Sequence, residues 1–169
     1  MDDAYPILRG KTNILYIPTF RRGESVRLDE LIQGVDFEKY NLIAQLHPLD
    51  LVGTHDDRVI YDKQFTVYDW IKKADIVITD YSSLIIECLI LKKQLYFYLY
   101  DLDKYAKDPG LNLDFEAEGL GQFVFRDGHQ LKNVLQKAYD YETLQRLEKK
   151  YVEIDVENSL QELGKMING

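Results

Sequence analysis

A short polar segment between two apolar runs has the composition of an anion-binding turn. Residues 80–83, Asp-Tyr-Ser-Ser, follow the β-branched run 75–79 and precede the apolar run 84–91. This pattern predicts a buried strand that leads directly into a helix. Backbone N–H groups, the hydroxyls of Ser82 and Ser83 and the positive end of the helix dipole would converge on one point, which favours a phosphate. The alternative is that Asp80 or Ser82 only caps the helix.

Two further segments offer groups that bind phosphate. Pro18-Thr19-Phe20-Arg21 follows the apolar run 14–17, and the planar fork of a guanidinium suits phosphate oxygens. His47 precedes a proline, which restricts its backbone to extended conformations, and its ring can donate a hydrogen bond or exchange a proton near neutral pH. The alternatives are a solvated surface arginine and a structural histidine. As a loop residue, Arg21 is expected to contribute almost nothing to thermal stability.

The elements that must position these residues alternate between strands and helices. Strands are expected at 14–17, 42–46, 58–61, 75–79, 94–98 and 122–125, and helices at 26–33, 66–73, 84–91, 129–139, 141–151 and 156–167. Thr66 and Asp69 form a variant of the capping box at the start of the second helix. The alternation predicts an α/β fold, a Rossmann-like parallel sheet flanked by helices, over residues 14–169 after a loose lead-in at 1–13. In such sheets ligands bind at the carboxyl ends of the strands, where all these polar segments fall.

Composition excludes several other classes of protein. The formal net charge of −8 over 169 residues argues against general binding of nucleic acid. No apolar run approaches the ~20 residues of a membrane span, so direct membrane insertion by this segment is not expected. Asp101-Leu102-Asp103 resembles the metal-binding aspartate pair of one class of glycosyltransferases, but it is more typical of a helix start. Without a His or Cys cluster, no metal site is expected.

Four segments together resemble one family: YIPTFR (16–21), LHP (46–48), VYDWIKKADIVITDYSS (67–83) and YFYLYDLDKY (96–105). They are similar to the CDP-glycerol glycerophosphotransferases of teichoic acid biosynthesis. The resemblance implies the C-terminal, donor-binding half of a GT-B type fold. It also implies transfer of glycerol phosphate, or a related polyol phosphate, from a CDP-linked donor to a lipid-linked acceptor held by an N-terminal domain outside this chain. CDP-glycerol would be the substrate, with no cofactor, and the full-length protein would act in the cytoplasm on the inner face of the plasma membrane.

The resemblance also implies roles for individual residues. His47 would stabilise the leaving group, and Glu87 would approach ribose or glycerol hydroxyls. The loop 61–66 would face the cytosine ring. The expected substrate-binding residues are Thr19, Arg21, His47, Thr66, Asp80, Ser82, Ser83 and Glu87.

The chain departs from the family pattern at two places. Residues 155–161, DVENSLQ, lack the family's Asp-Gly step and the arginine that follows it, and DFEAEGLGQ lacks the usual proline. The polyol could therefore differ. A nucleotide-sugar transferase of the GT-B type and a non-catalytic nucleotide-binding domain remain the alternatives. With half of the cleft absent, the chain alone is expected to bind the donor weakly without turnover.

Overall fold

A parallel sheet forms the centre of the molecule. The computed structural model describes residues 1, 3–22, 25–50, 55–107 and 113–152. Within these residues the strands are β1 (Thr12–Tyr16), β2 (Tyr40–Ala44), β3 (Val59–Ile60), β4 (Ile76–Thr79), β5 (Gln94–Tyr98) and β6 (Val124–Phe125). Their order is β3-β2-β1-β4-β5-β6, and every neighbouring pair is parallel. This is the Rossmann order, with its switch point between β1 and β4, and it confirms the predicted fold class.

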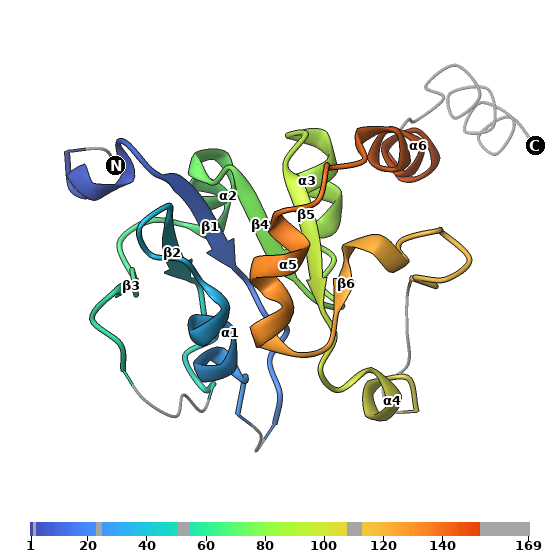
Figure 1. Cartoon of the computed structure of the whole chain (residues 1–169), viewed down its shortest axis with the longest axis horizontal. Coiled ribbons are helices and arrows are strands. Elements are labelled where there is room, and N and C mark those ends of the chain that lie inside the picture. Colours follow the sequence, from blue (N-terminus) through green and yellow to red (C-terminus); the bar gives the residue numbers. More distant parts are fainter. Residues whose placement is uncertain (2, 23–24, 51–54, 108–112, 153–169) are drawn as a thin grey trace, which may run out of the picture.

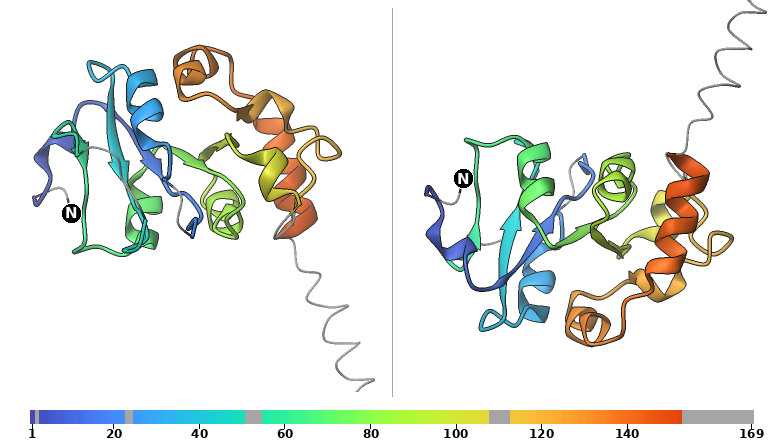
Figure 2. Two further views of the ribbon diagram at one scale, coloured as in Figure 1. Left: turned by 90° about the horizontal axis from the view of Figure 1, so that it is seen from below. Right: turned by 90° about the horizontal axis from the view of Figure 1, so that it is seen from above.

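Helices cover both faces of this sheet (Figures 1 and 2). One face carries α1 (Leu28–Gly34) and α5 (Leu131–Leu135), and the other carries α2 (Val67–Lys73) and α3 (Ile85–Ile90). α6 (Tyr141–Tyr151) packs against α3, and α4 (Leu102–Tyr105) lies beyond the carboxyl end of β5. Three short 3-10 turns complete the description: η1 (Pro6–Leu8), η2 (Gly121–Phe123) and η3 (Gly128–Gln130).

The central strands are covered on both faces and are largely apolar, with Asn13 and Asn41 among the buried polar exceptions. All four residues of β4, Ile-Val-Ile-Thr, are buried, and so are the last four residues of β1, β2 and β5. Strands buried on two sides lose the alternation of polar and apolar residues. Among the described residues, no helix is both long enough and apolar enough to cross a membrane.

Several expected elements are confirmed and others shift. The strand 94–98 and the helix 141–151 have the predicted bounds, and Thr66 and Asp69 form the predicted capping box. β1 and β2 begin two residues earlier than expected, at Thr12 and Tyr40. The expected helix 129–139 is only the short pair η3 and α5, and the expected helix 156–167 lies outside the described residues.

The expectation of a loose lead-in at residues 1–13 is wrong from Tyr5 onward. Leu8 is buried, and its carbonyl accepts a hydrogen bond from the Asn13 side chain at 3.2 Å. The Asn41 side chain donates to the Ile7 carbonyl at 2.9 Å, and the Tyr5 hydroxyl donates to Asp62 at 2.7 Å. Buried amide and carboxylate groups therefore anchor this segment to the sheet, which its polar composition does not reveal.

The backbone of η3 packs directly against that of α1. A Cβ atom at Gly128 would lie 2.3 Å from the carbonyl carbon of Glu30, so only glycine fits there. This contact fixes α1, and the Glu30 carboxylate in turn accepts a hydrogen bond from the Tyr98 hydroxyl at 3.0 Å.

We predict that Gly128→Ala lowers the free energy of unfolding by at least ~1–3 kcal/mol, because the added methyl group meets backbone rather than a movable side chain. Gly121→Ala is the matched control, since a Cβ there would meet nothing within 4 Å. Urea denaturation measures both variants. Equal urea midpoints for the two variants would contradict the prediction, because they would show that α1 can move away from η3 without loss of stability.

Candidate functional site

A buried ion-pair cluster joins the carboxyl ends of β1, β4 and β5. Arg21, which follows β1, is 7% exposed. Its Nη2 donates to Asp80 Oδ2 at 3.0 Å, and its Nε donates to Asp101 Oδ2 at 2.7 Å. Its Nη1 donates to the Thr19 carbonyl at 2.5 Å. We call Thr19, Arg21, Asp80 and Asp101 the Arg21 cluster; it lies at the switch point of the sheet, where ligands of this fold bind.

Asp80 is the most buried member of the cluster, at 1% exposed. Its carboxylate accepts hydrogen bonds from the Thr19 backbone N–H at 2.9 Å and from the Thr19 hydroxyl at 2.6 Å. It therefore faces back toward β1. The reading in which Asp80 caps the following helix is wrong; instead the Ser82 hydroxyl accepts from the Leu84 N–H at 3.3 Å.

Three tyrosine rings enclose the Arg21 guanidinium. Its carbon lies 4.7 Å from the Tyr105 ring centre, 5.2 Å from that of Tyr81 and 5.8 Å from that of Tyr100. Such cation–π contacts strengthen when water is excluded. Burial by itself lowers the pKa of Arg21, but the hydrogen bond to Asp101 and the charge of Asp80 outweigh it and raise that pKa. The guanidinium is therefore permanently charged.

The expectation that Arg21 is a loop arginine that does not help to hold the fold together is wrong. Its Nε, Nη1 and Nη2 atoms all donate to protein groups, and its side chain is nearly inaccessible. Sequence reasoning could not reveal this pairing, because Asp80 and Asp101 lie 59 and 80 positions further along the chain. One cation against two carboxylates leaves the cluster net negative, so its immediate effect is to fix three strand ends rather than to attract an anion.

His47 is exposed at the end of β2, beside the segment that follows β1. Its ring lies against the Phe20 ring, with centres 4.6 Å apart. The Leu49 N–H donates to His47 Nδ1 at 3.2 Å, so the neutral ring carries its proton on Nε2 and presents a donor. The His47 N–H donates to Asp50 Oδ2 at 2.7 Å, which fixes the turn.

The predicted serine turn leads into α3, and its two hydroxyls differ. Ser82 is half-buried and its hydroxyl accepts the Leu84 N–H, whereas Ser83 is exposed. Within the described residues, the Ser83 hydroxyl and the Ser82 and Ser83 backbone N–H groups make no hydrogen bond to protein. These donors are therefore free to meet a ligand.

Two other expected site residues, Glu87 and Thr66, lie on the helices α3 and α2 or at their starts. Glu87 is half-buried in the first turn of α3, and its carboxylate makes no hydrogen bond to any described residue. The Thr66 hydroxyl is engaged in the capping box with Asp69, to which it donates at 2.6 Å. Thr66 therefore stabilises α2, and a ligand would compete for the same hydroxyl.

Two cavities flank this edge of the sheet. One of about 740 Å³ opens at the ends of β2 and β3, and its lining includes Gln45, His47, Asp50, His55 and Tyr61. A smaller one of about 200 Å³ lies beside α3 and is mostly apolar; its lining includes Ser82, Ser83, Ile86, Phe115 and Tyr151. The described part of the chain holds no group of three or more His, Cys, Asp or Glu residues placed to bind a metal.

Comparisons with known proteins agree on one family. The family model described as CDP-Glycerol:Poly(glycerophosphate) glycerophosphotransferase matches residues 1–169. A teichoic acid ribitol-phosphate primase of Bacillus spizizenii is 32% identical over 89% of this chain and 40% of its own length. A teichoic acid glycerol-phosphate primase of Bacillus subtilis is 33% identical over 96% of this chain and 45% of its own length.

Solved structures agree with the family match. The wall teichoic acid polymerase TagF superposes with a TM-score of 0.69 at 25% identity, over 99% of this chain and 46% of that one. The chain thus spans less than half the length of these relatives.

We predict that Arg21→Ala lowers the free energy of unfolding by ~3–5 kcal/mol, because it leaves the buried Asp80 and the largely buried Asp101 carboxylates without their cation. Arg22→Ala is the matched control: Arg22 is exposed, and its removal should change stability by less than ~0.5 kcal/mol. Thermal melts of both variants test this prediction. Equal melting temperatures would show that the Arg21 cluster does not stabilise the fold.

Proposed function

The chain belongs to the CDP-glycerol:poly(glycerophosphate) glycerophosphotransferase family, and on that premise we propose that it binds the CDP-linked polyol phosphate donor of a teichoic-acid-type transferase. The observation that carries the proposal is the arrangement at the switch point. The free donors of Ser82 and Ser83 after β4 and the Nε2–H of His47 after β2 flank the Arg21 cluster. Donors converging at this position suit a pyrophosphate.

The buried and exposed groups have separate tasks in this proposal. The Arg21 cluster holds the strand ends at fixed positions, with the Thr19 and Asp80 hydrogen bonds closing it. The Ser83 hydroxyl, the adjacent backbone N–H groups and His47 contact the pyrophosphate, and Glu87 lies one turn further along α3. The nucleoside occupies the cavity at the ends of β2 and β3.

The reaction proposed for the whole enzyme is displacement at phosphorus. A hydroxyl of the lipid-linked acceptor attacks the phosphorus of the polyol phosphate, the bond to CMP breaks, and the hydroxyl proton passes to a base outside this chain. Charge builds up on the CMP phosphate as it leaves, and the Nε2–H of His47 would stabilise it by a hydrogen bond. The acceptor, its domain and a position on the inner face of the plasma membrane belong to this proposal, as does the absence of a cofactor.

We predict that the 169-residue chain binds CDP-glycerol in calorimetric titration and transfers nothing, because the acceptor half is absent. Adding EDTA should leave the affinity unchanged, since protein donors meet the phosphates. Loss of binding in EDTA with rescue by Mg²⁺, or turnover at the rate of a two-domain enzyme, would contradict this prediction. Absence of any CDP-glycerol binding would overturn the proposed function.

We also predict that Ser83→Ala weakens CDP-glycerol binding about tenfold or more, the loss expected for a hydrogen bond to a charged phosphate. Its melting temperature should not change, because the hydroxyl bonds no described protein group. Ser82→Ala should in addition lower stability by ~1 kcal/mol through loss of its hydrogen bond with the Leu84 N–H. Asn133→Ala, an exposed polar change on α5, is the control. If Ser83→Ala binds CDP-glycerol with unchanged affinity, the pyrophosphate must bind elsewhere on the chain.

A further inference from the structure

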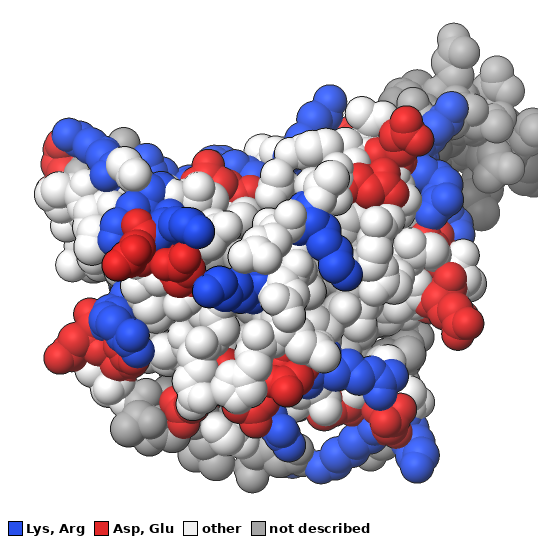
Figure 3. Space-filling model, in the orientation of Figure 1, with Lys and Arg blue, Asp and Glu red and all other residues white. Residues whose placement is uncertain are grey.

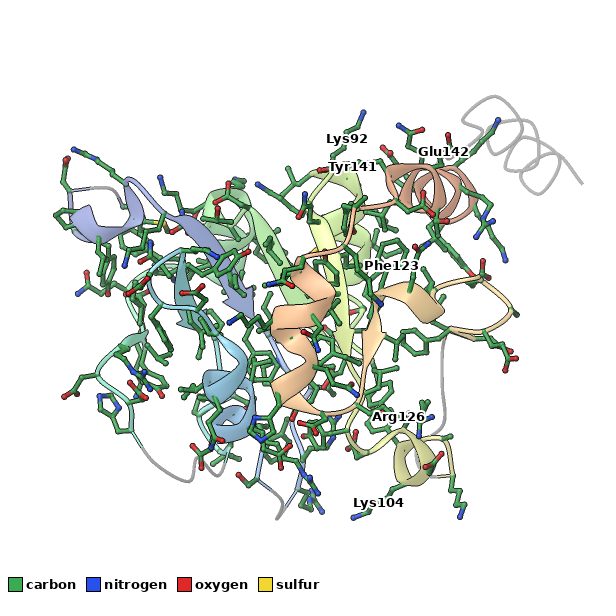
Figure 4. All side chains as sticks on the ribbon, viewed as in Figure 1. Lys92, Lys104, Phe123, Arg126, Tyr141 and Glu142 are labelled. Atoms are coloured by element: carbon green, nitrogen blue, oxygen red, sulfur yellow. The ribbon has the colours of Figure 1, made fainter. Side chains whose placement is uncertain are left out.

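The end of α3, at the edge of the sheet opposite to the proposed donor site, carries an exposed aliphatic pair beside an exposed lysine. Ile90 is 51% exposed and Leu91 is 39% exposed, and Lys92 follows them. Tyr141, at the start of α6, is 51% exposed and lines one cavity together with Leu91 and Lys92 (Figure 4). Single exposed apolar side chains are ordinary, whereas a group of them indicates a contact surface. We call Ile90, Leu91, Lys92 and Tyr141 the α3 tip.

The backbone at Lys92 has a conformation that a lysine seldom adopts. The Lys92 N–H donates to the Leu89 carbonyl at 2.9 Å and the Lys93 N–H donates to the Cys88 carbonyl at 3.0 Å, which together form a Schellman motif. Lys92 occupies the left-handed position of this motif with a φ of 52°, and no other non-glycine residue of the described ranges has a positive φ. Glycine is usual at this position, because a Cβ atom is strained there.

The described part of the fold gives no structural reason for a lysine at this position. The Lys92 ammonium group makes no hydrogen bond or ion pair with a described residue. A cation at the negative end of the α3 dipole would be one reason, but Lys93 already supplies it and donates its Nζ to the carbonyls of Lys72 and Ala74, each at 2.8 Å. A strained backbone that the surrounding contacts do not explain points to a function of the side chain.

The charge beside the tip is opposite in sign to that of the chain. The charged residues that line the cavity beside the tip are Lys11, Lys39, Lys92, Lys93, Glu38 and Asp75. Lys39 is paired with Asp36 at 3.3 Å, so three lysines face two carboxylates and leave a charge of +1. The whole chain carries −8. An anionic surface would therefore be repelled by most of the molecule and meet it most favourably here.

We propose that the α3 tip is the surface through which this chain contacts an anionic lipid membrane, at the level of the headgroups and without a spanning segment. Ile90 and Leu91 would enter the interface, Tyr141 would lie at its polar boundary, and Lys92 would meet the lipid phosphates. The choice of a lipid partner rests on the proposed function, because the acceptor proposed there is lipid-linked. Ser83 precedes α3 and Lys92 follows it, so the donor site would lie roughly 14 Å from this surface, at 1.5 Å per residue.

The first test is co-sedimentation of the whole chain with vesicles at low ionic strength. Wild type should sediment with vesicles of phosphatidylglycerol and phosphatidylcholine in equal parts, and much less with phosphatidylcholine alone. Added salt should weaken the binding, because it screens the lysine charges. If wild type does not bind the mixed vesicles but binds CDP-glycerol, this inference is overturned and the proposed function stands. If it binds the vesicles but not CDP-glycerol, the proposed function fails and the lipid-binding surface stands.

The second test separates lipid binding from stability at Lys92. Lys92→Gly should raise the melting temperature, because glycine relieves the left-handed strain, and yet weaken binding to the mixed vesicles about fivefold. Lys92→Arg, which keeps the charge, should bind the vesicles as wild type does. If Lys92→Gly binds lipid with unchanged affinity, or if its melting temperature falls, the lysine serves only to end α3 and the inference is overturned.

The apolar half of the tip has its own matched control. The double change Ile90→Ser with Leu91→Ser should weaken binding to the mixed vesicles about tenfold or more, with little change in melting temperature because both side chains are exposed. Leu49→Ser removes a leucine that is 67% exposed elsewhere on the chain, and it should bind the vesicles as wild type does. Equal vesicle binding by the double variant and Leu49→Ser would overturn the inference.

Discussion

One buried guanidinium, shared between two carboxylates, fixes the edge of the sheet on which the proposed site depends. Arg21 joins the segment after β1 to Asp80 after β4 and to Asp101 after β5. The hydrogen bonds of Thr19 to Asp80 close the same cluster. Removal of one partner would leave a buried charge uncompensated, which is why such a cluster tolerates little movement. The strand ends are therefore positioned before any ligand arrives, and a ligand need not order them.

The cluster cannot itself supply the attraction for an anion, because two carboxylates outnumber one arginine. The groups that face outward have to do so: the Ser83 hydroxyl, the neighbouring backbone N–H groups and the Nε2–H of His47. The wider surface helps little, since basic and acidic side chains are interspersed on the face shown in Figure 3 and the net charge is −8. Recognition would thus come from local geometry rather than from long-range charge.

Sequence reasoning predicted which segments meet at this edge of the sheet but not the bonds between them. Alternating apolar runs were enough to predict the sheet, and the rule that ligands bind at the carboxyl ends of strands brought Thr19, His47 and Ser82 to one edge. The pairing of Arg21 with Asp80 and Asp101 was not predictable, since it depends on burial across 59 to 80 residues of sequence separation.

The central claim is that the donor binds at the carboxyl edge of the sheet. The opposite edge carries a larger cavity, whose lining includes Lys39, Lys92 and Tyr141; Lys92 and Tyr141 lie at the top of Figure 4. The most direct measurement is a titration of the ¹⁵N-labelled chain with CDP-glycerol, followed by the backbone amide resonances. The account predicts shifts at His47, Ser82 and Ser83, with those of Lys92 and Tyr141 unchanged. Shifts confined to Lys92, Tyr141 and their neighbours would contradict it.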